Sequence, residues 1–464
     1  MQVLKQNSLL KKIGEIADHE KVEVYAVGGV VRDELLGREC KDIDFVIVGD
    51  GPSFAKAVAK KMQTKQLTIY QKFGTALVVY RDYNLEFVGA RKESYRSDSR
   101  KPTVTPADLS TDLARRDFTI NALAVGLNKI NFGEIVDHFN GQQDIKEKII
   151  RTPLDPVVTF EDDPLRIMRA IRFATQLGFT IDPETKAGIK KKAKRLDIIS
   201  PERITEEFLK ILLAPKPSIG FFLMEETGVL NFVFPEFDAL KGIEQMEGHH
   251  HKDVFRHTLK VVDNIAAVSQ DINLRYTALV HDIAKPKTKE FVKGKGWTFH
   301  NHEELGARML PGIGRRLRLP NEMTQYAQKL TRLHLRPISL TLEEVTDSAY
   351  RRLLVKTGEH LDDLLALCRA DITSQNPKRV QKHLANFDFV VKRLHEVEEK
   401  DQMRAFQSPV RGEEIMQVCN LKPGPQVGEL KKMIEEAILE GEIPNDYDAA
   451  YQYLLNIKNR VARD

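Results

Sequence analysis

Two aspartates separated by one residue, shortly after a pair of glycines, constrain this chain more than any other feature. The chain before Gly28 and Gly29 reads as a strand (residues 22–27), and the chain after them reads as a helix. Asp42 and Asp44 follow at the start of a second apolar run. Because side chains in a strand alternate with period two, both carboxylates are expected on one face of the sheet.

The glycine turn and the aspartate pair together indicate phosphate chemistry. A glycine turn at a helix N-terminus presents backbone N–H groups to a phosphate, and paired carboxylates bind divalent cations such as Mg2+. This combination predicts nucleotidyl transfer, in which two cations activate a hydroxyl nucleophile and stabilise the pyrophosphate leaving group. The alternative is a helix cap followed by a surface pair of carboxylates, because a lone Gly-Gly turn is a weak signal.

Composition limits the class of protein. The 464 residues are 42% hydrophobic, which is enough for two to four domains with ordinary cores. The net charge is only +4, so a surface for nucleic acid has to come from local basic clusters. Cys40, Cys368 and Cys419 are too scattered for a disulfide framework and favour a reducing compartment. With no signal-peptide core and no apolar run of about 18 residues, we expect a cytoplasmic protein without a membrane partner.

The chain changes character near residue 125. Before that point, short runs rich in Val, Ile and Tyr alternate with helices and predict one mixed sheet; those after the aspartates are residues 67–70, 75–80 and 85–88. After about residue 160 the pattern is helical to the end. The polar, basic stretch between Ala90 and Pro106 predicts a mobile loop. The expected fold class is therefore α+β, with a small mixed-sheet head and a helical remainder.

Glu86 is a candidate third carboxylate. It lies on the predicted strand at residues 85–88, on the side opposite Leu85 and Phe87. A third acid in a two-metal site lowers the pKa of the attacking hydroxyl. The alternative is an exposed glutamate on an alternating strand, and the sequence favours neither.

Arginines recur in two segments after the predicted sheet. Arg115 and Arg116 lie at the edge of an apolar helical segment, and guanidinium groups suit triphosphate oxygens. Read alone, this pair with Asp117 favours a salt-bridge cluster at a helix start. A second helix has Pro164 in its first turn and forms a basic stripe of arginines three residues apart: Arg166, Arg169 and Arg172.

Asp163 and Arg166 share a helix face, and this pairing has a specific chemical use. Cytosine and adenine each present an amino donor beside a ring-nitrogen acceptor, so a carboxylate and a guanidinium match both bases. Uracil and guanine present the reverse pattern. The pair therefore predicts selection of C and A without a nucleic-acid template. The alternative is an N-cap acid beside a solvated arginine.

These segments, in this order between residues 21 and 212, resemble the class II tRNA nucleotidyltransferase and bacterial poly(A) polymerase family. The resemblance rests on residues 28–33 with 42–44, 115–123, 137–145, 163–166 and 201–204. It implies a polymerase-beta-like nucleotidyltransferase head with Mg2+ at Asp42 and Asp44. The residues that it implies for the nucleotide are Gly28, Gly29, Arg32 and Arg115 for the triphosphate, Asp163 and Arg166 for the base, and Arg169 and Arg172 in support. The family usually has Glu where this chain has Asp162, one methylene shorter.

A second set of residues has the chemistry of metal ligands. His281 and Asp282 lie in an apolar segment that is predicted to be helical, and imidazole and carboxylate groups suit Mg, Mn, Fe, Ni or Zn. Histidines taken one at a time are ordinary surface or core residues. In their order along the chain they resemble the HD phosphohydrolase superfamily. This resemblance implies Mn, Ni, Co, Fe, Zn or Mg2+ bound by His257, His281, Asp282 and Asp371, with His302 and His334 for a second metal.

The two resemblances imply four domains: a head at residues 1–150, a helical RNA-binding neck at 151–240, an HD domain at 241–380 and a helical arm at 381–464. They imply template-independent addition of CMP and AMP from CTP and ATP to the 3′ end of tRNA, with phosphohydrolase activity in the HD domain and no DNA partner. Poly(A) addition is the nearest alternative; the lack of a long basic tail, the intact HD module and the turn at residues 422–428 favour tRNA. The alternatives of other classes are an HD phosphohydrolase whose head only senses nucleotide, and a non-catalytic RNA-binding protein.

Overall fold

The computed structural model describes residues 7–71, 74–96, 99–247, 250–293, 296–341, 345–373, 376–401 and 406–458. The chain divides into two compact units, Met1–Asp238 and Ala239–Asp464. Within the described ranges, none of the helices combines the length and the apolar character needed to cross a bilayer.

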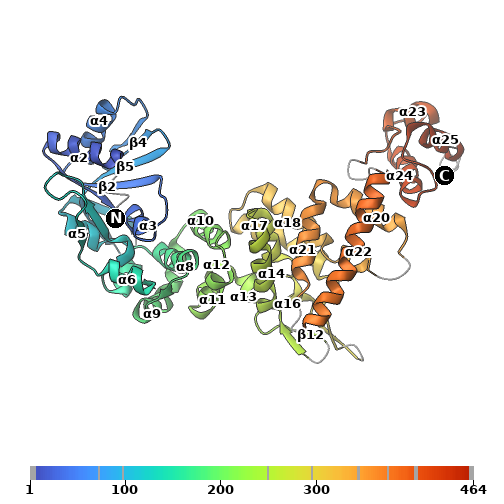
Figure 1. Ribbon diagram of the computed structural model, residues 1–464. Coiled ribbons are helices and arrows are strands. Elements are labelled where there is room, and N and C mark those ends of the chain that lie inside the picture. The colour runs from blue at the N-terminus through green and yellow to red at the C-terminus, as the bar shows by residue number, and fades with distance from the viewer. Residues whose placement is uncertain are drawn as a thin grey trace. The chain divides into compact units, whose positions relative to one another are not determined.

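The N-terminal part of the first unit contains a seven-stranded mixed sheet (Figure 1). Its strand order is β3-β4-β5-β2-β1-β8-β9; β2 and β5 run parallel, and the other neighbours are antiparallel. The strands are β1 (Glu23–Val27), β2 (Asp42–Val48), β3 (Leu67–Tyr70), β4 (Thr75–Tyr80), β5 (Tyr83–Gly89), β8 (Leu123–Gly126) and β9 (Ile135–Asp137). The mixed sheet expected from the sequence is confirmed.

One face of this sheet is covered by helix α4 (Gly51–Lys61), with α2 (Ser8–Glu20) packed beside it. Phe45 of β2 and Phe87 of β5 stack with their ring centroids 4.8 Å apart, and Phe54 of α4 meets Phe87 edge-on at 5.7 Å. Because β2 alternates, burial of Phe45 on this face turns Asp42 and Asp44 to the other face.

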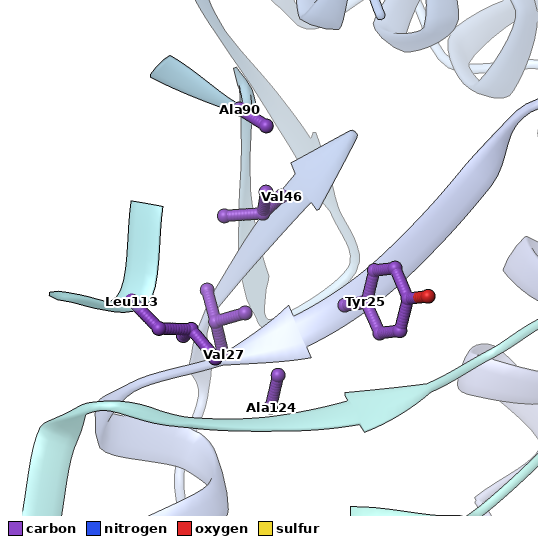
Figure 2. Packing of buried hydrophobic residues seen from close by; sticks show 6 residues of the cluster. All are labelled: Tyr25, Val27, Val46, Ala90, Leu113 and Ala124. Atoms are coloured by element: carbon purple, nitrogen blue, oxygen red, sulfur yellow. The ribbon is translucent and has the colours of Figure 1, made fainter. Parts of the chain in front are cut away.

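The second face carries a smaller apolar cluster beside the aspartates. Figure 2 shows its members on β1, β2, β8 and the neighbouring segments: Tyr25, Val27, Val46, Ala90, Leu113 and Ala124. Leu113 of α5 (Leu109–Ala114) reaches towards Val27 in that view. Val46 follows Asp44 by two residues and is 1% exposed, so this packing fixes the strand on which the aspartates lie.

The stretch between Ala90 and Pro106 was expected to be a mobile loop, and that expectation is wrong. Strands β6 (Arg91–Arg96) and β7 (Ser99–Pro106) pair as an antiparallel hairpin. The prediction gave weight to the polar, basic composition of this stretch and overlooked its β-branched residues Thr103, Val104 and Thr105, which favour a strand. Residues 97–98 lie outside the described part of the chain.

From Pro156 onward the first unit is helical, as predicted, apart from the two-residue strand β11 (Thr180–Ile181), which pairs with β10 (Ile149–Ile150). The helices are α7 (Pro156–Asp162), α8 (Leu165–Leu177), α9 (Pro183–Lys192), α10 (Pro201–Leu212), α11 (Ser218–Glu226), α12 (Val229–Val233) and α13 (Pro235–Asp238). Phe208 of α10 meets Phe221 and Phe234 edge-on at 5.7 and 5.9 Å, so aromatic packing joins these helices. Asp163 and Pro164 lie at the break between α7 and α8.

In its described residues, the second unit is helical apart from two hairpins, β12–β13 and β14–β15. Its longer helices are α14 (Val254–Val268), α15 (Ile272–Val280), α17 (His302–Arg316), α18 (Asn321–Leu333), α20 (Asp347–Thr357), α21 (Leu361–Asp371), α22 (Pro377–Asp401), α24 (Pro425–Glu440) and α25 (Tyr447–Ile457).

His281 and Asp282 were expected inside a helix, and the structure corrects this. Helix α15 ends at Val280, His281 is its C-cap, and Asp282 lies in the turn before α16 (Lys285–Thr288). Pro286 has no N–H to donate to the carbonyl of Asp282, four residues earlier, and its ring would clash with that carbonyl. Pro286 therefore favours a break of the helix in this segment.

Candidate functional sites in the head and the HD domain

The sheet brings three carboxylates to one face. In the parallel register of β2 and β5, Asp44 is paired with Glu86 and Asp42 with Asn84. Asn84 Nδ2 donates to Asp42 Oδ1 at 2.8 Å, which holds one carboxylate in place. Glu86 alternates with the buried Leu85 and Phe87, so it projects on the same face as the aspartates.

Burial and a neighbouring carboxylate raise the pKa of Asp44 and of Glu86. Burial raises the pKa of Asp44; Arg116 opposes that rise and Asp42 adds to it. Burial also raises the pKa of Glu86, and the charge of Asp44 raises it further. Burial and a neighbouring negative charge both disfavour the ionised carboxylates here, and a hard divalent cation would offset that cost.

Gly28 forms the turn between β1 and helix α3 (Gly29–Leu35) that the sequence predicted. Its φ of 74° lies in the region that favours glycine, and a Cβ there would come 2.9 Å from Nη1 of Arg116. A side chain at this position would therefore strain the backbone and push away a cavity-lining arginine.

A chain of hydrogen bonds positions two of the predicted arginines. Arg32 Nη1 donates to Asn121 Oδ1 at 2.7 Å, and Asn121 Nδ2 donates to Asp117 Oδ1 at 3.0 Å. Asp117 Oδ2 accepts from Arg169 Nε and Nη2 at 2.7 and 2.6 Å. Burial acts to raise the pKa of Asp117, but Arg169 and Asn121 outweigh it and lower that pKa to about 2. Asp117 therefore stays ionised and holds Arg169 at the cavity.

Arg115 and Arg116 share a buried acid that the sequence did not single out. Asp112 is fully buried and accepts from Arg115 Nη2 at 2.7 Å and from Arg116 Nη2 at 3.2 Å. The arginine pair is thus held by Asp112, one turn upstream, rather than by the neighbouring Asp117. Both guanidinium groups remain partly exposed and line the same cavity.

The proposed base-reading pair is anchored by the backbone. Asp163 Oδ1 accepts from the N–H of Leu165 at 3.1 Å, and its other oxygen lies 4.0 Å from Nη2 of Arg203. Arg166 Nη2 donates to the carbonyl of Arg115 at 2.6 Å. Both side chains therefore have fixed positions at the cavity wall, with polar atoms left for a ligand.

Arg172 differs from the other arginines of the stripe. It is 9% exposed, and its Nε lies 3.1 Å from Oε2 of the buried Glu207 on α10. Its guanidinium carbon also lies 4.3 Å from the centroid of the Phe173 ring. Arg172 lines the cavity, and its ion pair with Glu207 also ties α8 to α10.

One cavity of about 810 Å³ collects the predicted head residues. Asp42, Asp44 and all the predicted nucleotide-binding residues line it, whereas Glu86 lines a smaller adjoining cavity that also includes Asp44. Asn121, Phe173 and Arg203 line the larger cavity without having been predicted. Asn121 and Arg203 lie in the sequence blocks at residues 115–123 and 201–204 that carry the family resemblance. Their polar side chains within those blocks could have identified them as candidate cavity residues.

The second unit gathers the six predicted ligands of the HD domain. His257, His281 and Asp371 form one group and Asp282, His302 and His334 another, each with ligand atoms within 4.8 Å of one another. Asp371 Oδ1 lies 2.8 Å from Nε2 of His257, and Asp282 Oδ1 lies 3.2 Å from Nε2 of His302.

The histidine tautomers fit a metal centre. The Nδ1 atoms of His281, His302 and His334 lie 2.8, 2.7 and 2.6 Å from the backbone carbonyls of Ala278, Phe299 and Thr331. An Nδ1–H that donates to a carbonyl leaves the Nε2 lone pair available to a metal. Nε2 of His281 and of His302 are buried and make no regular hydrogen bond among the described residues; both atoms face carboxylate oxygens instead, at 3.2 to 3.5 Å.

Charge in this cluster also favours cations. Burial acts to raise the pKa of Asp282 and of Asp371, but cationic neighbours lower both well below the usual range: Lys285 and His281 for Asp282, and His257 and His281 for Asp371. Burial lowers the pKa of His281, yet Asp282 and Asp371 outweigh it and raise that pKa to about 10. The two buried carboxylates demand positive charge, which a protonated His281 supplies and which a divalent ion would supply in place of that proton.

Three parts of the chain match described families. Residues 24–151 match the poly A polymerase head domain, residues 178–241 the probable RNA and SrmB-binding site of polymerase A, and residues 254–375 the HD domain. A nucleotidyltransferase head and an HD domain imply a dependence on divalent metals.

Relatives match over most of the chain. It is 30% identical to the A-adding tRNA nucleotidyltransferase of Deinococcus radiodurans over 91% of this chain and 93% of that protein. It is 32% identical to the multifunctional CCA protein of Cupriavidus metallidurans over 75% of this chain and 84% of that protein. A crystal structure of a tRNA nucleotidyltransferase complexed with a primer tRNA and an incoming ATP analog matches with 26% identity and a TM-score of 0.60, over 83% of this chain and 99% of that one.

Proposed function

This chain belongs to the tRNA nucleotidyltransferase family, and on that premise we propose that it adds CMP and AMP to the 3′ end of tRNA without a template. Its substrates are CTP, ATP and tRNA that lacks part or all of its CCA end, and it acts in the cytoplasm. The observation that carries the proposal is one cavity holding Asp42 and Asp44 together with Asp163 and Arg166. A carboxylate pair for transfer and a base-reading pair in one cavity support a polymerase that chooses its nucleotide with protein side chains.

Each group has a defined task in this reaction. Asp42 and Asp44 would hold Mg2+, which when bound lowers the pKa of the RNA 3′ hydroxyl and stabilises the pyrophosphate. Arg32, Arg115 and Arg169 donate hydrogen bonds to triphosphate oxygens. Asp163 accepts from the amino group of C or A, and Arg166 donates to the neighbouring ring nitrogen, so U and G leave both side chains unsatisfied.

A product-length assay tests this proposal. Purified protein is incubated with tRNA ending before CCA, after the first C or after CC, together with labelled CTP, ATP or both. We expect completion of all three ends and growth that stops at the terminal A. Addition of AMP only to the CC end would restrict the activity to that of the A-adding relative, long A tails would indicate poly(A) polymerase, and no incorporation would refute the proposal.

The HD cluster supports a second activity, hydrolysis of phosphate esters. Its six ligands fit two divalent ions, either Mg2+ or a transition metal (Mn, Ni, Co, Fe or Zn), which when bound supply a nucleophilic hydroxide and polarise a phosphoryl oxygen. Lys285 Nζ lies 2.7 Å from Asp282 Oδ2 and lines the same cavity, so it is placed to meet an anionic ester. Release of phosphate from 2′,3′-cyclic or 3′-phosphate ends, measured with each metal in turn, tests this activity.

A further inference from the structure

The cavity that contains most of the candidate metal ligands of the HD domain is also lined by aromatic side chains, called here the aromatic wall. Metal binding does not require these side chains. The cavity has a volume of about 540 Å³, which is within the range of small-molecule sites. Five of the six candidate ligands line it together with Lys285. Its other lining residues include Trp297, Phe299 and Phe387, which cannot coordinate an ion.

Trp297 lies on a short hairpin at this cavity. Strands β14 (Glu290–Val292) and β15 (Gly296–Thr298) pair so that Phe291 is directly opposite Trp297. The two rings meet edge-on at 5.3 Å, and they remain 62% and 40% exposed. Mutual packing accounts for their contact with each other. This packing does not explain why the indole of Trp297 is partly exposed and lines the cavity that contains the candidate metal ligands.

Positive charge accompanies the aromatic wall. The ammonium of Lys289 lies 4.5 Å from the centroid of the Trp297 ring, and that of Lys285 lies 5.7 Å from the centroid of Phe299. Lys287 and Lys293 stand in the same short segment of the sequence. An aromatic surface beside lysines and candidate metal ligands complements a ligand with a flat heterocycle at one end and a phosphate at the other.

We propose that Trp297 is a base-stacking residue of this cavity, and that the occupant is a nucleotide whose phosphate ester lies towards Lys285 and the metal ligands. The inference deepens the hydrolytic activity proposed above and rests on it for the fate of the phosphate. Stacking on an indole is tolerant of base identity, so Trp297 would set affinity for nucleotides over other phosphate esters without selecting among bases. The nucleotide is either free or the 3′-terminal unit of an RNA.

The chain's only tryptophan is Trp297, so its fluorescence reports on this cavity alone. Full-length, Mg2+-loaded protein is titrated with adenosine 3′-phosphate, ribose 5-phosphate or inorganic phosphate, and the initial emission is read with correction for absorbance. We expect saturable quenching by adenosine 3′-phosphate and none by the two ligands without a base. Equal responses to all three, or none to adenosine 3′-phosphate, would overturn the stacking role.

Variants of the hairpin give a second readout. Trp297→Leu should raise KM for adenosine 3′-phosphate about tenfold, the loss expected for one base stack, while kcat/KM for glycerol 2-phosphate stays within about twofold. Trp297→Phe should restore most of the affinity. The control is Phe291→Leu, which removes the opposite ring of the same hairpin and should have little effect. An equal loss in Phe291→Leu would assign the effect to hairpin stability and overturn the proposal.

Two further outcomes separate the linked proposals. If wild-type protein releases no phosphate from any ester, the hydrolytic activity fails, and the fluorescence titration still decides whether Trp297 stacks on a base. A minihelix RNA with a 3′-phosphate is then compared with adenosine 3′-phosphate by the same quenching. Tighter binding of the RNA identifies a terminal nucleotide as the occupant, and equal binding identifies a free nucleotide.

Discussion

Asp44 and Glu86 are paired in register across the parallel strands β2 and β5, although 41 residues separate them in the chain. Burial raises the pKa of both groups, and the charge of Asp44 raises the pKa of Glu86 further. A protein retains such a costly arrangement where a cation or a proton transfer uses it.

Replacing either aspartate should therefore abolish nucleotide addition. In Asp42→Ala and Asp44→Ala we expect incorporation of labelled CMP into tRNA to fall below a few per cent of wild type, while the thermal midpoint stays near that of wild type, because the loss of a repulsive carboxylate costs little stability. Asp82→Ala removes an exposed carboxylate from the turn between β4 and β5 and is the matched control. Substantial incorporation by both aspartate variants would refute the metal assignment.

Glu86→Gln tests whether the third carboxylate takes part in chemistry. The amide keeps the size of the side chain but neither accepts a proton nor carries charge, so kcat should fall by about 10²- to 10⁴-fold with KM little changed. Steady-state kinetics with CTP and a tRNA lacking CCA measure both constants. A kcat within threefold of wild type would leave Glu86 as an exposed strand residue beside the site.

Asp163→Ala should relax the choice of base. Without the carboxylate, the amino group of C loses its acceptor and the carbonyl of U no longer meets a negative charge, so the ratio of kcat/KM for CTP over UTP should fall at least tenfold. Asp163→Asn keeps an oxygen for the N–H of Leu165 and serves as the variant that preserves the α8 start. A constant ratio with both rates reduced would mean that the pair only positions the triphosphate.

The Asp117–Arg169 ion pair predicts a specific pH dependence of stability. The folded pKa of Asp117 is about 2, below its ordinary 3.8, so the stabilisation is complete above pH 4 and is lost as the pH falls from about 4 towards 2. Asp117→Asn should lower the stability of the first unit by about 1 to 2 kcal/mol at pH 7. Urea midpoints of wild type and variant should differ equally at pH 7 and 5, and less at pH 3.5. A larger difference in urea midpoint at pH 3.5 than at pH 7 would contradict the lowered pKa of Asp117.

The sequence predicted those parts of the fold and site that depend on short-range pattern. Period-two alternation placed Asp42 and Asp44 on one face. Three-residue spacing predicted one helix face for Asp163 and Arg166, but Asp163 lies at the break before α8, and the two residues share the cavity without sharing a helix. Contacts between distant segments could not be predicted from local pattern. Glu86 lies beside Asp44 because β2 pairs in parallel with β5, and the hydrogen bond from Arg32 to Asn121 likewise depends on the tertiary fold. Pro286 indicated a helix break in the segment after α15, but the apolar run before it suggested one continuous helix through Asp282.

The two compact units predict that the two activities are separable. His281→Ala and Asp282→Ala should remove metal-dependent phosphate release and leave nucleotide addition within about twofold, because both ligands lie in the second unit and the nucleotide cavity lies in the first. Loss of metal should also lower the thermal midpoint of the second unit, since ligands from several helices no longer share an ion. His395→Ala, on the exposed side of α22, is the control and should change neither activity. If nucleotide addition fell together with phosphate release while the protein stayed folded, the cluster would support the first reaction instead of acting independently.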